Sequence, residues 1–192
     1  MDVPPTDVGD ALELIGGELD ATVDHLRRRA GSGLEAVAEA IAASPRVFVL
    51  GAGRSGLALR MTAMRLMHLG LDVQVVGEVT TPAIRAGELL LTASGSGTTT
   101  SIVRAAETAV AVGARVAAIT TDPASPLAAL AGATIVVPAA GKLDRSGTAS
   151  AQYAGSLFEQ TVVLLGDALF HALWQRSGAS ADDLWPRHAN LE

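Results

Sequence analysis

The chain has 192 residues and a formal net charge of −6 at pH 7; 49% of its residues are apolar and only 3% are aromatic. The length is enough for one domain, residues 1–192, with a buried core. The negative charge argues against nucleic acid or an anionic membrane surface as a partner, and no uninterrupted apolar run is long enough to cross a bilayer. The absence of cysteine excludes disulfides and thiol chemistry. Because the N-terminus shows no signal pattern, we expect a cytoplasmic protein.

Two amphipathic helices are predicted in residues 7–43. Apolar side chains recur there at three- and four-residue steps, the spacing of one helix face. The sequence Gly31-Ser32-Gly33 is expected to separate the two helices, because glycine favours helix ends over helix interiors. The second helix should then run from Leu34 to Ala43 and end before Pro45.

Apolar runs alternate with helical patterns over residues 46–177, which predicts an α/β core. The strands are expected at residues 47–50, 73–76, 89–93, 115–120 and 134–137, and the helices at 54–69, 102–112, 126–130 and 156–175. Such alternation is typical of a parallel sheet with helices on both faces. Ligands on these sheets bind at the carboxyl ends of the strands.

The helix expected over Ser156–Gln175 is apolar on nearly all sides, so it must be covered on several of them. In a chain this short, we expect another subunit to supply part of the cover, in a homo-oligomer such as a dimer or tetramer. Residues 141–153 before this helix are predicted to form an irregular loop. Residues 178–192 after it are predicted to form a C-terminal tail.

A hydroxyl-rich glycine loop, Ser94-Gly95-Ser96-Gly97-Thr98-Thr99-Thr100-Ser101, separates a predicted strand from a predicted helix. The first turn of a helix presents unpaired N–H groups and the positive end of the helix dipole. Glycine lets the backbone approach a ligand closely, and hydroxyls add donors without charge. The loop therefore indicates a phosphate monoester site. The alternative is an ordinary N-cap with additional serines.

A second glycine loop, Gly51-Ala52-Gly53-Arg54-Ser55-Gly56, follows the first predicted strand. It matches the G-x-G-x-x-G fingerprint of dinucleotide binding, and Glu78 lies near the end of the next strand. Against that interpretation, Arg54 and Ser55 are polar, and the hydroxyl loop has no role in the fingerprint. The two loops together favour a small phosphorylated ligand. Arg54 is a candidate contact for its phosphate or a hydroxyl, with a surface salt bridge as the alternative.

With both loops placed, the chain resembles the SIS (sugar isomerase) domain family, and within it the 6-phospho-3-hexuloisomerases. The resemblance extends from about Leu12 to the C-terminus. The segments that carry it are Gly51–Gly56, Met64–Gly70, Val76–Glu78, Thr81–Ile84, Ser94–Gly97, Gly155–Gln160 and Arg187–Glu192. There are two departures from the family pattern. Thr98 stands where a glutamate is common, and Tyr153-Ala154-Gly155 stands where Pro-Met-Gly is common.

The resemblance implies a three-layer, flavodoxin-like fold with a five-stranded parallel sheet. It also implies a phosphorylated ketohexose as substrate, with no cofactor. The reaction would interconvert D-arabino-hex-3-ulose 6-phosphate and D-fructose 6-phosphate, a step of the ribulose monophosphate route of formaldehyde fixation. The expected substrate contacts are Gly53, Arg54, Ser55, Ser94, Gly95, Ser96, Thr98 and Thr99.

Glu159 is the candidate catalytic base. Moving a carbonyl from C3 to C2 requires a proton to leave C2 and to return at C3, and one partly desolvated carboxylate can carry out both transfers. Glu159 lies near the start of an otherwise apolar helix, within the family-like segment Gly155–Gln160. The alternative is a first-turn glutamate that only stabilises the helix dipole.

His188 is the candidate for moving the proton between the two substrate oxygens, because histidine titrates in the right range. By resemblance to related isomerases, such a C-terminal histidine can enter the site of a neighbouring subunit. The alternative is a mobile tail. His68 and Glu78 are candidate pocket-lining residues, and His68 could instead stabilise a helix C-terminus. The spacing of the four histidines makes a metal site unexpected.

Two other functions stay open at this point. One is arabinose 5-phosphate isomerase, whose members often carry further C-terminal domains. The other is a non-catalytic phosphosugar-binding SIS protein. Such sensors usually carry a DNA-binding segment, and the sequence shows no basic helix-turn-helix pattern.

Overall fold

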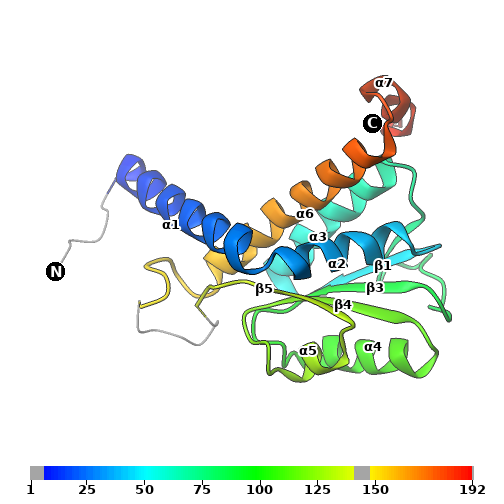
Figure 1. Cartoon of the computed structure of the whole chain (residues 1–192), viewed down its shortest axis with the longest axis horizontal. Coiled ribbons are helices and arrows are strands. Elements are labelled where there is room, and N and C mark those ends of the chain that lie inside the picture. Colours follow the sequence, from blue (N-terminus) through cyan, green and yellow to red (C-terminus); the bar gives the residue numbers. More distant parts are fainter. Residues whose placement is uncertain (1–6, 141–147, 192) are drawn as a thin grey trace.

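Five parallel strands form one sheet in the computed structural model of the chain, in the order β2-β1-β3-β4-β5 (Figure 1). The structure describes residues 7–140 and 148–191. The strands are β1 (Val47–Gly51), β2 (Val73–Val75), β3 (Leu89–Ala93), β4 (Arg115–Thr120) and β5 (Ala133–Val136). This strand order is the flavodoxin-like one, so the expected fold class is confirmed.

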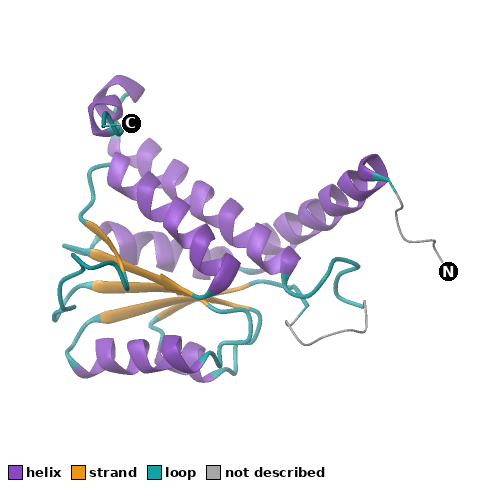
Figure 2. Ribbon diagram, turned by 180° about the vertical axis from the view of Figure 1, so that it is seen from behind, coloured by secondary structure: helices purple, strands orange, loops and turns teal. Residues whose placement is uncertain are grey.

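Helices cover both faces of the sheet. The helices in the described residues are α1 (Val8–Arg29), α2 (Gly31–Ala42), α3 (Gly53–His68), α4 (Thr100–Ala111), α5 (Pro126–Leu130), α6 (Ser156–Ser177) and α7 (Ala181–Leu184), and a 3₁₀ turn follows at Trp185–Arg187. Helices α2, α3 and α6 pack on one face and α4 and α5 on the other (Figure 2). The central strand β3 is buried at every residue, which explains its uninterrupted apolar run.

The boundary between α1 and α2 differs from the prediction. Only Ala30 separates the two helices, and the glycines at 31 and 33 lie in the first turn of α2. At Gly33, a Cβ atom would lie 2.5 Å from the carbonyl oxygen of Thr134 in β5. Glycine is therefore needed there for the close approach of α2 to the sheet edge, rather than to end a helix.

Three helices of the same chain pack against α6, and the expected contribution of another subunit to its cover stays a prediction. Helices α1, α2 and α3 all contact it, and its buried side chains face the main core. Leu164 remains 41% exposed. Although α6 is strongly apolar, neither it nor any other helix in the described residues is long and apolar enough to cross a membrane.

Candidate active site

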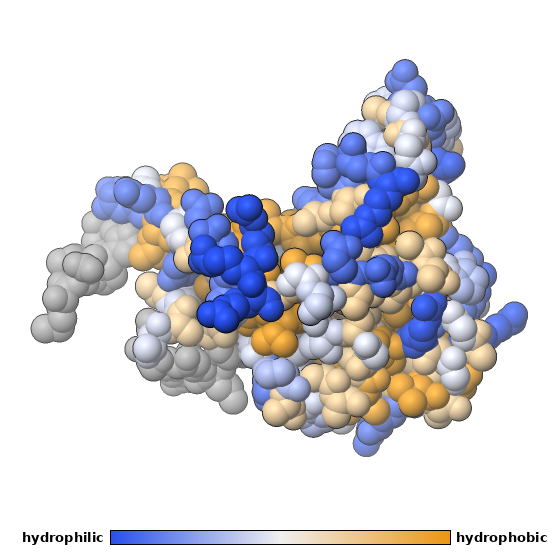
Figure 3. Space-filling view, in the orientation of Figure 1, coloured by the Kyte–Doolittle hydropathy of each residue, from blue (hydrophilic) through white to orange (hydrophobic). Residues whose placement is uncertain are grey.

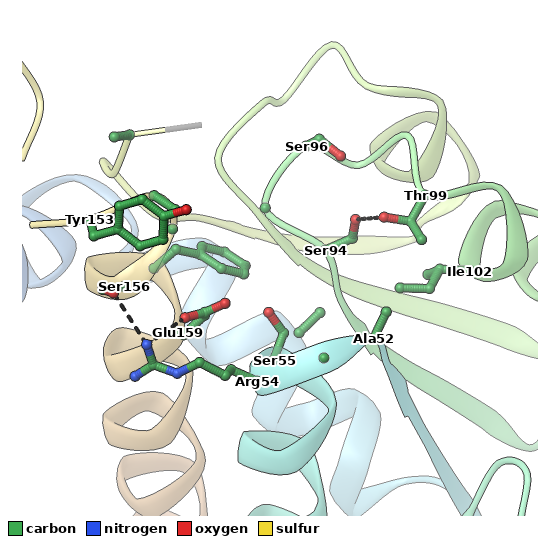
Figure 4. Close-up of a pocket in the computed structure, with 17 residues that line it drawn as sticks. Ala52, Arg54, Ser55, Ser94, Ser96, Thr99, Ile102, Tyr153, Ser156 and Glu159 are labelled. Atoms are coloured by element: carbon green, nitrogen blue, oxygen red, sulfur yellow. Dashed lines mark hydrogen bonds and ion pairs between the residues drawn. The ribbon is translucent and has the colours of Figure 1, made fainter. Parts of the chain in front are cut away.

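A pocket of about 370 Å³ opens at the carboxyl ends of β1 and β3 (Figure 4). The chain leaves β1 and β3 toward opposite sides of the sheet here, which is where ligands bind in open parallel sheets. The lining comes from the loop after β1, the loop after β3, and the start of α6. Its members are Ala52–Ser55, Ala93–Ser96, Thr99, Ile102, Ala140, Tyr153–Ser156, Phe158 and Glu159.

The hydroxyl loop is held in place by its own side chains and by the strand next to it. The Ser94 and Thr99 hydroxyl oxygens lie 3.1 Å apart, and the Gly95 carbonyl accepts hydrogen bonds from the backbone and hydroxyl of Thr121. Thr99 is the N-cap residue of α4, yet its side chain makes no capping hydrogen bond. The structure therefore gives no support to a simple N-cap role for this hydroxyl.

The glycines of the first loop have separate roles. A Cβ atom on Gly56 would lie 2.5 Å from the Gly51 carbonyl oxygen, so both positions permit the tight packing of α3 against β1. Gly53 has φ = 57°, and a Cβ atom there would meet nothing within 4 Å. It opens α3 with a left-handed residue at the pocket wall. Close packing thus explains two of the three fingerprint glycines without a dinucleotide.

Glu159 and Arg54 face each other across the pocket mouth (Figure 4). The Arg54 Nη1 atom lies 3.2 Å from Glu159 Oε2, and it also donates a hydrogen bond to Ser156 Oγ at 3.2 Å. The Glu159 side chain is 23% exposed, whereas that of Arg54 is 60% exposed. The two contacts of the guanidinium fix how the Glu159 carboxylate is oriented at the start of α6. The Arg54 salt bridge is thus made to the candidate base itself.

His188 and His68 lie together at the end of α3 and α6 that is remote from the pocket (Figure 1). Their rings stack with centroids 4.1 Å apart, and the Trp185 ring lies 4.8 Å from that of His188. The Arg187 guanidinium donates to the His68 carbonyl. The C-terminal tail is therefore folded against α3, and Glu159 and His188 of one chain do not meet.

Burial lowers the pKa of His68, and the neighbouring charges of His188 and Arg65 lower it further. Its Nδ1 atom is buried without a hydrogen-bond partner among the described residues. Burial and these charges thus favour the neutral form of the His68 imidazole.

Two further candidates lie outside the pocket lining. Glu78 pairs with Arg60 of α3, with 2.7 Å between Oε1 and Nη1. The Thr98 hydroxyl donates to Ser96 Oγ at 2.9 Å within the hydroxyl loop, and Thr98 is not part of the pocket wall. In residues 7–140 and 148–191, no cluster of three or more histidine, aspartate or glutamate side chains could hold a metal.

Ser156 and Phe158 line the pocket although they were not among the expected substrate contacts, and Tyr153, noted in the sequence as a departure from the family pattern, belongs to the wall as well. They fall in or beside the segment Gly155–Gln160, whose polar start before an apolar helix could have pointed to them. The expected loop at 141–153 is irregular over residues 148–153, and residues 141–147 lie outside the described part of the chain.

Comparisons with known proteins identify the family of the chain. A family model described as the SIS domain matches residues 40–164. The chain is 61% identical over 147 residues to the 3-hexulose-6-phosphate isomerase of Mycobacterium gastri, a match covering 77% of this chain and 74% of that protein. It is 40% identical over 157 residues to the protein of the same name from Bacillus subtilis, covering 81% and 85%.

A solved structure of a related protein has the same fold as this chain. The protein MJ1247 from Methanococcus jannaschii, for which a molecular function of 3-hexulose-6-phosphate isomerase has been inferred, superposes with a TM-score of 0.79 at 28% identity. The match covers 95% of this chain and 99% of that one. The chain belongs to the SIS domain family and, within it, to the 3-hexulose-6-phosphate isomerases.

Proposed function

We propose that the chain interconverts D-arabino-hex-3-ulose 6-phosphate and D-fructose 6-phosphate through a cis-enediol, with Glu159 as the base. One observation carries this proposal: Glu159 and the hydroxyl loop line the same pocket. A phosphosugar could therefore place its phosphate on the loop and its reacting carbons at the carboxylate. Neither alternative function is favoured, because the named curated relatives are hexulose phosphate isomerases.

The reaction needs one base that moves a proton between C2 and C3, and a group that moves a proton from O2 to O3. Glu159 takes the proton from C2 of the 3-ulose, and the C3 carbonyl becomes the enediol oxygen. The same carboxyl group returns the proton at C3, while the hydroxyl proton on O2 is lost and O3 gains one. The Arg54 guanidinium is next to Glu159, so it can also stabilise the negative charge that develops on the enediolate.

The phosphate end would be held by neutral donors. Ser94, Ser96 and Thr99 present hydroxyls to the pocket, and the N-terminus of α4 follows directly after them. Hydroxyls, backbone N–H groups and the helix dipole are sufficient to bind a phosphate. Gly53 and Ser55 would contact the sugar from the opposite wall.

We further propose that the protein is a homo-oligomer in which His188 serves the pocket of a neighbouring subunit. The distance between the His68–His188 cluster and the pocket of the same chain supports this. An exposed apolar stripe on α3, formed by Leu57, Met61 and Met64, lies between the two ends and is suited to a subunit contact. Further apolar surface is visible in the angle between α1 and α6 (Figure 3).

Deuterium exchange tests the reaction. The purified chain is incubated with D-fructose 6-phosphate in D₂O and the sugar is followed by NMR. We expect deuterium at C3, because that carbon is the one deprotonated on the way to the 3-ulose. Deuterium at C1 alone would indicate aldose–ketose chemistry instead and contradict the proposal. A parallel incubation with D-arabinose 5-phosphate tests the alternative substrate.

A further inference from the structure

The carboxylate of Glu18, in the middle of α1, holds the segment that leads into α6. Its Oε1 accepts a hydrogen bond from the backbone N–H of Ala151 at 2.6 Å. Its Oε2 accepts from the Ser150 hydroxyl at 2.7 Å and from the side-chain amide of Gln152 at 2.9 Å. We call these four residues the Glu18 clasp. It joins parts of the chain more than 130 positions apart.

The contacts fit a structural anchor rather than a surface helix residue. Glutamate on a helix is mostly solvated, yet here both oxygens are used and every partner is a neutral donor. Burial raises the pKa of Glu18, but the hydrogen bonds from Ser150, Ala151 and Gln152 outweigh this and lower it overall. The ionised carboxylate is therefore the form that the segment stabilises.

The clasp continues to the residue next to the candidate base. The Oε1 atom of Gln152 accepts a hydrogen bond from Gln160 Nε2 at 2.9 Å. Gln160 directly follows Glu159 in the first turns of α6. The other amide atom of Gln160, Oε1, is buried without a partner among the described residues. The side chain is thus fixed at one end only, through Gln152.

The segment between the clasp and α6 is the pocket wall itself. Tyr153, Ala154, Gly155 and Ser156 all line the pocket. Ala154 has φ = 52°, a left-handed conformation that a non-glycine residue keeps only where its surroundings impose it. The Gly155 carbonyl then accepts from the Glu159 N–H at 3.0 Å. Anchoring residues 150–152 therefore fixes both this wall and the start of the helix that carries the base.

We propose that Glu18 is a positioning residue of the isomerase site, acting on Glu159 and on the wall at 153–156 through Ala151, Gln152 and Gln160. This inference rests on the proposed function. It assigns a role in the reaction to the long N-terminal helix, which contributes no residue to the pocket.

The test compares Glu18→Ala with Glu18→Gln in the full chain. The alanine variant removes all three acceptor contacts, and a misplacement of about 1 Å at a reacting group can cost on the order of 100-fold. We expect kcat to fall about 10- to 100-fold. The glutamine variant should stay within about threefold of wild type, because side-chain amides both donate and accept and those of Gln152 and Gln160 can turn over. Glu13→Ala, an exposed carboxylate on the same helix, is the matched control.

A local readout separates positioning from general destabilisation. Tyr153 is the only tyrosine of the chain and is 91% exposed, so 3-fluorotyrosine incorporation gives one ¹⁹F NMR signal that reports the wall. We expect this signal to shift and sharpen in Glu18→Ala and to a smaller degree in Gln152→Ala. Rates and spectra are recorded at a temperature at which thermal unfolding curves show Glu18→Ala and Glu13→Ala to be fully folded.

Two results would overturn the inference. One is a Glu18→Ala enzyme with wild-type kcat and an unchanged ¹⁹F signal. The other is a Glu18→Gln enzyme as impaired as Glu18→Ala, because the charge rather than the hydrogen bonds would then matter. If the wild-type chain showed no exchange into D-fructose 6-phosphate, the proposed function would fail, and the ¹⁹F comparison would still decide whether Glu18 orders the wall.

Discussion

Two variants that are each inactive should restore activity to each other when mixed, if neighbouring subunits share a site. Glu159→Gln keeps the shape of the base but cannot accept a proton, and general-base removal costs about 10²- to 10⁴-fold. His188→Ala removes the exposed imidazole of the tail. In a shared-site dimer of one variant with the other, one site lacks both groups and the other site is complete.

In the structure, His188 and Glu159 of one chain are too far apart to act in the same pocket. Helix α3 begins at Gly53 in the pocket wall and ends 15 residues later at His68, a separation of about 22 Å at ~1.5 Å per residue. His188 stacks on His68 at 4.1 Å, whereas proton transfer requires contact at about 3 Å or through one water. A chain in this conformation cannot bring its own His188 to its own Glu159.

The expected recovery follows from the mixing. With equal amounts of both variants and free exchange between the subunits of a two-fold symmetric dimer, half of the dimers are mixed and half of their sites are complete, so about 25% of wild-type activity should return. Activity is followed by NMR as conversion of D-fructose 6-phosphate into D-arabino-hex-3-ulose 6-phosphate, which needs both groups in the proposed mechanism, and native mass spectrometry confirms that mixed oligomers have formed. If mixed oligomers form while activity stays at the level of the single variants, the shared site is wrong and the reaction assignment is untouched.

Three further predictions concern the phosphate, the helix pair and the tail. Replacing Ser94 and Ser96 by alanine should raise the dissociation constant for D-fructose 6-phosphate in calorimetry, since each hydrogen bond to a charged group contributes about 1.5–3 kcal/mol; unchanged affinity would place the phosphate elsewhere. Gly166→Ala should destabilise by about 1–3 kcal/mol, because its Cβ would overlap Thr62 Oγ1 between α6 and α3; Gly17→Ala, where a Cβ meets nothing within 4 Å, is the control in thermal unfolding. The pKa of His68 is lowered in the folded chain from its ordinary value of 6.5. Docking of the tail is therefore most stable above pH 6.5 and loses stability as the pH falls from 6.5 through the lower pKa of the folded chain. Amide exchange of residues 181–188 should accelerate at pH 5.5, and His188→Ala, which removes one of the neighbouring charges, should weaken this pH dependence.

The strands and most helices follow from the sequence because their burial is simple. The apolar runs at 89–93 and 115–120 are strands with those bounds, since strands covered on both faces need apolar residues throughout. The start of α2 was wrong because the reason for Gly33 lies in the carbonyl of Thr134, about a hundred positions away. A local rule about glycine cannot include that neighbour.

The candidate site could also be predicted only in part from the sequence. The hydroxyl loop and the first glycine loop follow β3 and β1, so their meeting at one edge follows from the topology of a parallel sheet. Glu159 joins them only because α6 packs along α3, and this placement came from resemblance to a family rather than from spacing. The stacking of His188 on His68 and the Glu78–Arg60 pair depend on side-chain geometry at remote positions, which no periodicity encodes.

The division of charge in the pocket fits the proposed reaction. Arg54 is the cationic residue among the lining residues, and its guanidinium is engaged by Glu159 and Ser156 rather than by the hydroxyl loop. A phosphate held by neutral donors leaves this cation at the reacting end, where the enediolate develops its charge and where a charge in a partly buried site is more effective than in water. The two glycine-rich loops would then have separate tasks in the proposed mechanism, with binding assigned to the loop after β3 and electrostatic stabilisation to the loop after β1.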